Sequence, residues 1–383
     1  MATLVYRTAG ESHGQALIAL IEGMPAGVPL DQALIDGELR RRQGGYGRGG
    51  RQKIEADAAQ ILCGVRRGKT IGSPIAVQIV NRDSRLDEAP ALHRPRPGHA
   101  DLAGSIKWLT ADCRSTLERA SARETASRVA AGAIARCVLR EIGIEVIGYV
   151  VSIGQATAKL DAAMGLEELR RRRDASDVYC PDEAASERMR QLIRQAKIDG
   201  DTLGGLVEAR AVGCPPGLGS CVQHDQRLDA RLAMAAMGIQ AIKAVEIGLG
   251  KEVAFLPGSK VHDAIAFDAA QRNQPSLGFV RPTNNAGGLE GGMTNGQAIV
   301  VRAAMKPIST LLKALPSVDL NTKQAAPADY ERSDVCAVPA ASVVLENAVA
   351  FEVARAAIEK FGGDSLDEMK TNYESFLAAA RRL

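Results

Sequence analysis

The chain has 383 residues, of which 46% are hydrophobic and 24% charged, which is ordinary for a soluble globular protein of one or two domains. The net charge is only +3 and aromatic residues make up 3%, whereas a dedicated nucleic-acid-binding protein is usually more basic and stacks bases on aromatic rings. The seven cysteines are an odd number with no C-x-x-C, which argues against a disulfide framework and against a zinc site.

Hydrophobic patterning predicts strands and helices in an irregular order. In chain order we expect a strand at 17–21, a helix at 30–39, a strand at 74–80, a polar loop at 81–101, a long helix at 121–142, strand 144–153, helix 181–197, strand 203–212, helix 228–245, strand 298–304 and helices 342–361 and 365–382. This order favours an α+β or layered core over regular βαβ winding. No G-x-G-x-x-G or Walker-type loop supports a dinucleotide-binding or P-loop fold.

The helix at 121–142 has the clearest pattern. Ser121 and Glu124 are spaced as a capping box, in which each side chain accepts a hydrogen bond from the other residue's backbone. The apolar face consists mostly of small residues, and Gly143 is placed to end the helix. We therefore expect this helix to pack closely against another backbone.

Three glycine-rich loops expose polar residues. GESHG at 10–14 presents His13 between glycines, although a surface turn with a solvated histidine has even odds. The loop at 94–101 presents His99 with two arginines, and a histidine can exchange protons near neutral pH. The glycines at 284–296 carry a large ordering cost, which favours close approach to a flat or phosphorylated ligand over a plain connector.

The basic stretch at 40–53, RRRQGGYGRGGRQK, allows three interpretations. It could be a solvated surface loop, a disordered RNA-binding arm, or a cradle whose arginines bind phosphate or carboxylate groups. It lies between folded segments, whereas Arg-Gly-Gly arms are usually longer, repetitive and terminal. This context favours the anion cradle.

Other polar segments carry weaker signals. The lysine and hydroxyls of KPIST at 306–310 could bind an anion, and RSD at 332–334 lies in another loop. His93, His224 and His262 have little context. The histidines, cysteines and carboxylates show no metal-binding spacing, so we expect no metal.

Taken together, these segments resemble the chorismate synthase family. The matching stretches follow the family's order along nearly the whole chain: GESHG at 10–14, RRQGGYGRGGR at 41–51, RPGHAD at 96–101, RASARETASRVAAGAIAR at 119–136, GIQAIKAVEIG at 238–248, NNAGGLEGGMTNG at 284–296, KPIST at 306–310 and RSD at 332–334. Residues 155–200 match poorly, and we treat them as a variable peripheral segment.

The resemblance implies a reaction and a cofactor. The family converts 5-enolpyruvylshikimate 3-phosphate to chorismate and phosphate by a 1,4-anti elimination, the last common step of the shikimate pathway. The reaction needs reduced FMN although no net oxidation occurs. It also needs a pocket with many cations, because substrate and cofactor both carry phosphate.

The resemblance also implies roles for individual residues. His13 would protonate the departing phosphate, His99 would donate a proton near N1 of the reduced flavin, and Asp334 with Ser12 would assist at the flavin N5. Arg42 and Arg48 would bind substrate or NADP phosphate. The flavin site would consist of Arg119, Ala120, Ser121, Gln240, Ala241, Gly291, Lys306, Pro307, Ile308, Ser309, Thr310 and Arg332.

The family fold implies an α+β layered β-α-β sandwich, with one domain over residues 1–383, and a homotetramer. No reductase domain is visible in the sequence, so we expect a separate flavin reductase, with NADPH as an indirect reductant. We expect neither nucleic acid nor a membrane as a partner. The N-terminus lacks a signal-peptide pattern and no apolar run reaches ~18 residues, which favours a cytoplasmic protein.

Two other functions stay open on the sequence alone. An RNA-binding protein using residues 40–53 would show salt-sensitive binding to any polynucleotide. A flavin- or nucleotide-dependent oxidoreductase with another substrate would consume NADPH for each product formed.

Overall fold

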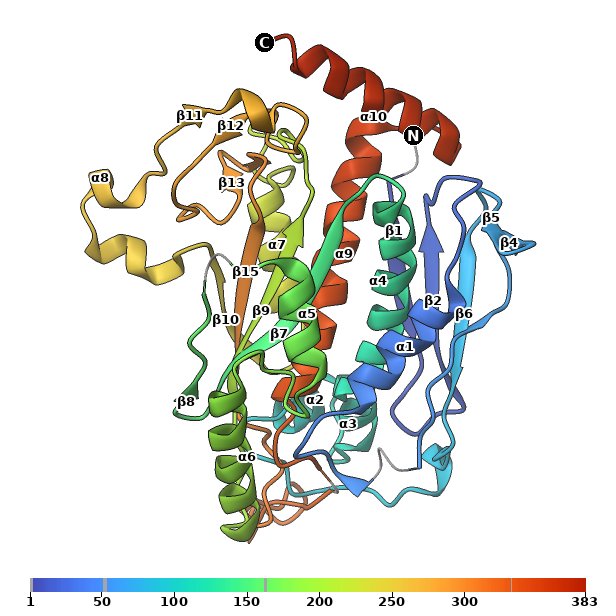
Figure 1. The fold of residues 1–383 in the computed structure, drawn as a ribbon. Helices are drawn as coiled ribbons and strands as arrows, with labels where there is room; N and C mark the ends of the chain where they lie inside the picture. The colour runs from blue at the N-terminus through green and yellow to red at the C-terminus, as the bar shows by residue number, and fades with distance from the viewer. Residues whose placement is uncertain (1–2, 51–53, 162–163, 332) are drawn as a thin grey trace.

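The computed structural model describes residues 3–50, 54–161, 164–331 and 333–383. In this part of the chain a layer of long helices lies between two antiparallel sheets (Figure 1). Helix α4 (Thr125–Arg140) contacts the first sheet, α9 (Val338–Phe361) contacts the second, and the two helices pack against each other. The predicted α+β sandwich with a central helical layer is therefore confirmed.

The first sheet has the strand order β1-β2-β6-β3. Its strands are β1 (Val5–Ala9), β2 (Ala16–Glu22), β3 (Gln60–Ile61) and β6 (Ile75–Val80). Alternate residues of β2 and β6 are buried, including Leu17, Ile21, Ile75 and Ile79. Alternate side chains therefore form one face of the sheet, which packs against the helical layer. The two strands predicted here are confirmed.

The second sheet has the order β10-β15-β9-β7-β8. Its strands are β7 (Glu145–Ile153), β8 (Ala156–Thr157), β9 (Gly205–Val212), β10 (Ile242–Ile247) and β15 (Ile299–Met305). Strand β9 pairs with both β7 and β15, so Ala209 lies between Gly148 and Val301. The predicted strands at 144–153, 203–212 and 298–304 agree with these bounds within two residues.

Small residues let the central helices approach closely. A Cβ atom on Gly132 of α4 would lie 2.3 Å from the backbone oxygen of Asn347 in α9, so a larger residue does not fit there. Beside this contact lies helix α1 (Gln32–Gln43), whose last turn begins the basic stretch. The expectation of close packing along the 121–142 helix is thus correct.

A buried ion network fixes α1 against its neighbours. Glu346 of α9 is fully buried and contacts Arg41, Arg136 and Arg173 at 3.0, 2.9 and 3.2 Å. Glu38 of α1 is also buried and contacts Arg136 at 3.1 Å. Burial by itself raises the pKa of the Glu38 carboxyl, but Arg136 and Arg41 overcome this and lower it to about 2.

The remaining elements lie around this core. The helices are α2 (Asp101–Lys107), α3 (Arg114–Ala120), α5 (Leu166–Asp174), α6 (Glu183–Ile198), α7 (Leu228–Met237), α8 (Gly258–Val261) and α10 (Leu366–Ala380). The hairpins are β4 (Val65–Arg66) with β5 (Lys69–Thr70), β11 (Ala266–Phe267) with β12 (Phe279–Val280), β13 (Leu289–Glu290) with β14 (Met293–Thr294), and β16 (Pro316–Val318) with β17 (Ala325–Pro327). Helices α5 and α6 occupy the segment at 155–200 that we treat as variable and peripheral.

Two sequence predictions were wrong. The helix predicted at 228–245 ends at Met237, because Gly238 caps it and Ala241 has a φ of +69°, and the chain then enters β10. The capping box does not form either. Ser121 accepts from Arg123 N at 3.3 Å and caps a short 3₁₀ turn, while Glu124 instead binds Thr8, Arg128 and Gln240.

Neither a membrane-crossing helix nor a metal site is found in the described ranges. Their helices are too short or too polar to span a bilayer. The same residues contain no group of three or more His, Cys, Asp or Glu side chains that could hold a metal ion. The seven cysteines are all free thiols.

Candidate functional site

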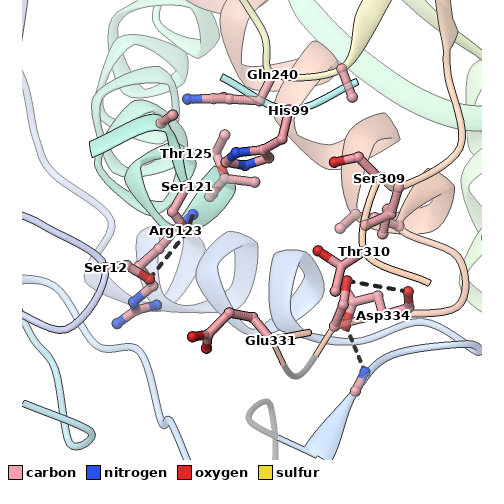
Figure 2. A pocket seen from close by; sticks show the side chains of 18 of the residues that line it. Ser12, His99, Ser121, Arg123, Thr125, Gln240, Ser309, Thr310, Glu331 and Asp334 are labelled. Carbon is pink, nitrogen blue, oxygen red and sulfur yellow. Dashed lines mark hydrogen bonds between the residues drawn. The ribbon is translucent and has the colours of Figure 1, made fainter. Parts of the chain in front are cut away.

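A pocket of about 560 Å³ opens among the loops at one end of the sandwich. Its walls come from the 10–14 loop, the basic loop after α1, the 81–101 loop, the start of α4, residues 239–241 and 305–310, and the segment before α9. Figure 2 shows side chains from these segments pointing toward one space, among them Ser12, His99, Gln240 and Asp334. The volume lies in the ~300–1,000 Å³ range of small-molecule sites.

Most of the predicted site residues line this pocket. They are Ser12, His13, Arg42, Arg48, His99, Ala120, Ser121, Gln240, Ala241, Lys306, Ile308, Ser309, Thr310 and Asp334. Of the other four predicted residues, the three that the structure describes do not appear in its lining. Arg119 and Pro307 lie beside it, Gly291 lies in the turn between β13 and β14, and Arg332 lies outside the described residues.

His13 is held by α3. Its Nδ1 lies 2.9 Å from Glu118 Oε1, and its backbone N–H donates to Glu118 Oε2 at 2.8 Å. The Nε2 atom lies 3.9 Å from Asp83 Oδ2, which also lines the pocket. The Glu118 contacts therefore fix both the backbone and the ring of His13.

Arg119 fixes the loop that carries His13. Its guanidinium donates to the carbonyl oxygens of Gly10 and Thr8, both at 3.1 Å. Gly10 has a φ of +99°, and a Cβ there would lie 2.2 Å from the Ala16 oxygen, so only glycine fits this turn. Within this chain Arg119 therefore braces the GESHG loop.

His99 lies beside a buried ion pair. Its Nδ1 is 2.5 Å from Asp101 Oδ1, and Arg96 donates to Asp101 Oδ2 at 2.8 Å and lies 3.0 Å from the same histidine nitrogen. Burial tends to raise the pKa of Asp101, but hydrogen bonds from His99 and Arg96 hold it well below its usual value. A carboxylate that stays ionised in this way orients the imidazole.

The basic stretch is folded into the pocket. Arg48 Nη1 lies 2.8 Å from Asp334 Oδ2, and Gly49 N–H donates to Asp334 Oδ1 at 2.6 Å. The backbone N–H of Val335 donates to the Gly47 oxygen at 2.9 Å. These contacts contradict a disordered arm over the described part of the stretch.

Arg42 is tied to a buried carboxylate. Its Nη2 donates to Asp57 at 2.8 Å, and Arg123 Nη1 donates to the same group at 2.7 Å. Burial lowers the pKa of Arg42 to about 10 even though Asp57 opposes this effect. Arg42 thus remains a cation at neutral pH, and its Nε has no hydrogen-bond partner among the described residues.

The wall opposite the basic loop carries groups suited to a polar ring system and a phosphate. The buried Oε1 of Gln240 has no hydrogen-bond partner among the described residues, while Nε2 of the same side chain donates to Glu124 at 2.9 Å. Lys306 supplies a half-buried cation beside Ser309. Burial lowers the pKa of Lys306, and the positive charge of Lys243 lowers it further. These donors and acceptors fit FMN.

Sequence reasoning assigned no role to several charged pocket residues. They are Asp83, Arg85, Arg96, Arg123 and Glu331, together with Glu118 behind His13. Arg96 begins the RPGHAD motif that contains His99, so the motif could have indicated a role for Arg96. Glu118 reads as an ordinary charged helix residue, and no local pattern distinguishes it.

The layered α+β fold and its cationic pocket define an enzyme that acts on small anionic molecules. The family model described as chorismate synthase matches residues 4–358. A chorismate synthase of Desulforamulus reducens is 54% identical over 393 aligned positions, covering 99% of this chain and 100% of that one. One from Moorella thermoacetica is 56% identical over 374 positions and covers 95% of each chain.

A solved structure agrees with the sequence relatives. A crystal structure of chorismate synthase has a TM-score of 0.81 and 42% identity, and the match covers all of both chains. The chain therefore belongs to the chorismate synthase family. Its function is the family's lyase reaction, the conversion of 5-enolpyruvylshikimate 3-phosphate to chorismate with loss of phosphate, a step of the shikimate pathway to the aromatic amino acids.

Proposed function

We propose that the pocket binds reduced FMN and 5-enolpyruvylshikimate 3-phosphate together and that His13, His99 and Asp334 act on them. The observation that carries this proposal is the gathering of these three residues around one cavity, although they lie far apart in the sequence. Among the described residues, six cationic side chains line the same cavity: Arg42, Arg48, Arg85, Arg96, Arg123 and Lys306. They offset the phosphates and carboxylates of the two ligands.

Gln240, Ser121 and residues 306–310 would hold FMN. Gln240 offers a buried acceptor for a ring N–H, and Lys306 with Ser309 and Thr310 offers donors for a phosphate. Arg119, Pro307 and Gly291 do not line the pocket, and Arg332 lies outside the described residues, so their roles toward FMN remain predictions. When bound, reduced FMN supplies electron density to the substrate ring as the C–O bond breaks.

Arg42 and Arg48 face the substrate side. Each has a buried Nε without a hydrogen-bond partner among the described residues, and each also contacts a carboxylate that fixes its position. Such preorganised guanidinium groups bind phosphate and carboxylate oxygens at little further entropic cost. They also line the position at which NADP phosphate would bind.

His13 is the general acid toward the departing phosphate. Because Glu118 contacts Nδ1, the Nε2 atom is the one that would donate. His99, with its ring fixed by Asp101, would supply a proton near N1 of the flavin. Asp334, which is oriented by Arg48, would assist at N5 together with Ser12.

The broader cellular setting is part of the proposal. We propose one domain over residues 1–383, assembly as a homotetramer and a cytoplasmic location. A separate reductase would supply reduced flavin, with NADPH as the indirect source of electrons.

An anaerobic assay tests the proposal. Reduced FMN and 5-enolpyruvylshikimate 3-phosphate are added to the protein, and chorismate absorbance and phosphate release are followed together. We expect equal amounts of the two products with no net oxidation of the flavin. An oxidoreductase would consume one equivalent of reductant per product, and that result would contradict the proposal.

Variants test the residue roles. We expect His13→Ala and His99→Ala each to reduce turnover on the order of 10²-fold or more, because each removes a general acid. Turnover close to that of the wild type in both variants would overturn the assigned roles.

A gel-shift assay with single-stranded RNA should show no retention, since the basic stretch lines the pocket.

A further inference from the structure

The side chain of Glu118 makes a two-point contact with His13. One carboxylate oxygen lies 2.9 Å from the ring nitrogen Nδ1, and the other accepts the backbone N–H of His13 at 2.8 Å. A third bond, from Ser12 N–H to the Glu118 carbonyl oxygen at 3.0 Å, fixes the loop to the same residue of α3. Main chain and ring are thus both oriented by Glu118.

Glu118 is buried and remains charged. Its side chain is only 1% exposed, and Arg114 Nη1 lies 3.5 Å from Oε1. Burial tends to raise the pKa of Glu118, but hydrogen bonds from His13 and the charge of Arg114 hold it below its usual value. Arg114 in turn contacts Glu331, which lines the pocket, at 2.9 Å.

Other charged groups also face His13. Asp83 Oδ2 lies 3.9 Å from Nε2, and Arg85 contacts Asp83 at 2.8 Å and so offsets part of its charge. Asp83 and Arg85 are both more accessible than Glu118 and lie on the pocket side of the ring. Glu118 is therefore the closer and less solvated carboxylate.

We propose that Glu118 is a positioning residue for the elimination, because it directs Nδ1–H of His13 away from the pocket and leaves Nε2–H as the proton that the substrate phosphate receives. This inference rests on the proposed role of His13 as the general acid. Asp83, the other carboxylate near His13, does not determine the tautomer in this proposal.

The proton and electron movements are consistent with this assignment. The C–O bond breaks, its electron pair leaves with the phosphate, and the Nε2 proton moves to a phosphate oxygen. The electron pair of the C–H bond lost from the other ring face completes the new double bond, and that hydrogen leaves as a proton that the Asp334 carboxylate, proposed above to assist on the flavin side, would finally accept. His13 is left neutral with its remaining proton on Nδ1, where the Glu118 carboxylate stabilises it, until solvent protonates Nε2 again.

The carboxylate also sets the pH range over which the acid works. A general acid is active while protonated, so its activity falls as pH rises through its pKa. A carboxylate within hydrogen-bond distance of an imidazole favours the charged form of the ring, and removing the carboxylate charge removes that preference. Loss of Glu118 should therefore move the alkaline fall of kcat to lower pH.

The test combines kinetics with nitrogen NMR of histidine-labelled protein. The chain has five histidines, so the His13 signal can be assigned by its loss in His13→Ala. In the wild type we expect the neutral ring to be the Nδ1–H tautomer. In Glu118→Gln we expect a shift toward Nε2–H, a kcat lower on the order of 10²-fold with little change in KM, and an alkaline limb that lies at lower pH.

Two further variants complete the design. Glu118→Asp keeps the charge and should retain more activity than Glu118→Gln, with the alkaline limb close to that of the wild type. Glu141→Gln is the matched control, because Glu141 contacts Lys370 far from the pocket lining. It should leave kcat and the pH profile unchanged.

The outcomes separate the two hypotheses. If His13→Ala keeps wild-type turnover, the proposed general acid is wrong whatever Glu118 does. If His13→Ala is inactive but Glu118→Gln keeps the wild-type tautomer and pH profile, the role of Glu118 alone is overturned. If Glu118→Gln fails to fold, two other results would still overturn the role of Glu118. One is an Nε2–H tautomer of His13 in the wild type. The other is a clear displacement of the alkaline limb of the kcat profile in Glu118→Asp.

Discussion

Arg48 and Asp334 form an ion pair of 2.8 Å inside the pocket, although 286 positions of sequence separate the basic loop from the segment before α9. Their side chains are largely buried, at 9% and 17% exposure. The pair therefore places a loop arginine and a pocket carboxylate in one fixed arrangement before any ligand arrives. It also closes the basic stretch onto the core.

Replacing Arg48 tests this arrangement. Arg48→Ala leaves Asp334 without its cation, and we expect kcat/KM to fall about 10- to 100-fold, which corresponds to about 1.4–2.7 kcal/mol of transition-state stabilisation. Arg48→Lys should recover only part, because an ammonium lacks the planar fork. The control is Arg40→Ala on the exposed face of α1, which should behave as wild type. Equal kcat/KM values for all three variants would argue against a working role for the pair.

Asp101 should control His99. In Asp101→Asn the charged partner of Nδ1 and of Arg96 is lost, so we expect kcat/KM to drop by at least about 10-fold. The control is Asp31→Asn, because asparagine caps helix α1 as well as aspartate does. Steady-state kinetics on both proteins, with melting temperatures to compare folding, provide the measurement. A drop in melting temperature without a drop in kcat/KM would show that Asp101 is only structural.

Gly132 should be required for packing of α4 against α9. A methyl group at this position would lie 2.3 Å from the Asn347 backbone oxygen, and we expect Gly132→Ala to destabilise the fold by ~1–3 kcal/mol or more. Gly37 in α1 is the matched control, since a Cβ there meets nothing within 4 Å. Gly37→Ala should stabilise by ~0.5–1 kcal/mol because it favours the helix. Urea unfolding of both variants distinguishes them, and a neutral Gly132→Ala would contradict the close approach.

Acid should weaken the network that holds α1. The folded-state pKa of Glu38 is about 2, below the unfolded value of ~4.3, so the folded state binds this proton less readily than the unfolded chain. The resulting stabilisation is fully present above about pH 4.5 and is lost as pH falls toward 2. We expect the free energy of unfolding of the wild type to decrease through this window.

Glu38→Gln provides the comparison. It should lower stability at pH 7, because Arg136 and Arg41 lose a charged partner, and it should flatten the dependence between pH 2 and 4.5. Urea unfolding at several pH values measures both effects. An unchanged slope in Glu38→Gln would assign the acid sensitivity to other carboxylates.

Local patterns predicted the main elements well and failed where tertiary contacts overrode them. The strands at 17–21 and 74–80 and the helix at 342–361 lie in strongly apolar segments, and the structure contains them. The apolar spacing at 228–245 is also helical, yet Gly238 and Ala241 end α7 and residues from Ile242 onward join the second sheet. Antiparallel pairing with β15 at the edge of the second sheet outweighs local helix propensity there.

The sequence by itself determined the family, the order of the motifs and the residue types that converge on a cationic pocket, because these depend on short segments that keep their chemistry wherever they fold. Only the tertiary structure decided which carboxylate each functional group meets. Glu118 beside His13 and Asp57 between Arg42 and Arg123 read in sequence as ordinary charged residues. Their charges matter because folding removes these groups from water, so that each charged group interacts mainly with its partner in the protein. The partners come from distant segments of the chain, and such pairing has no local sequence pattern.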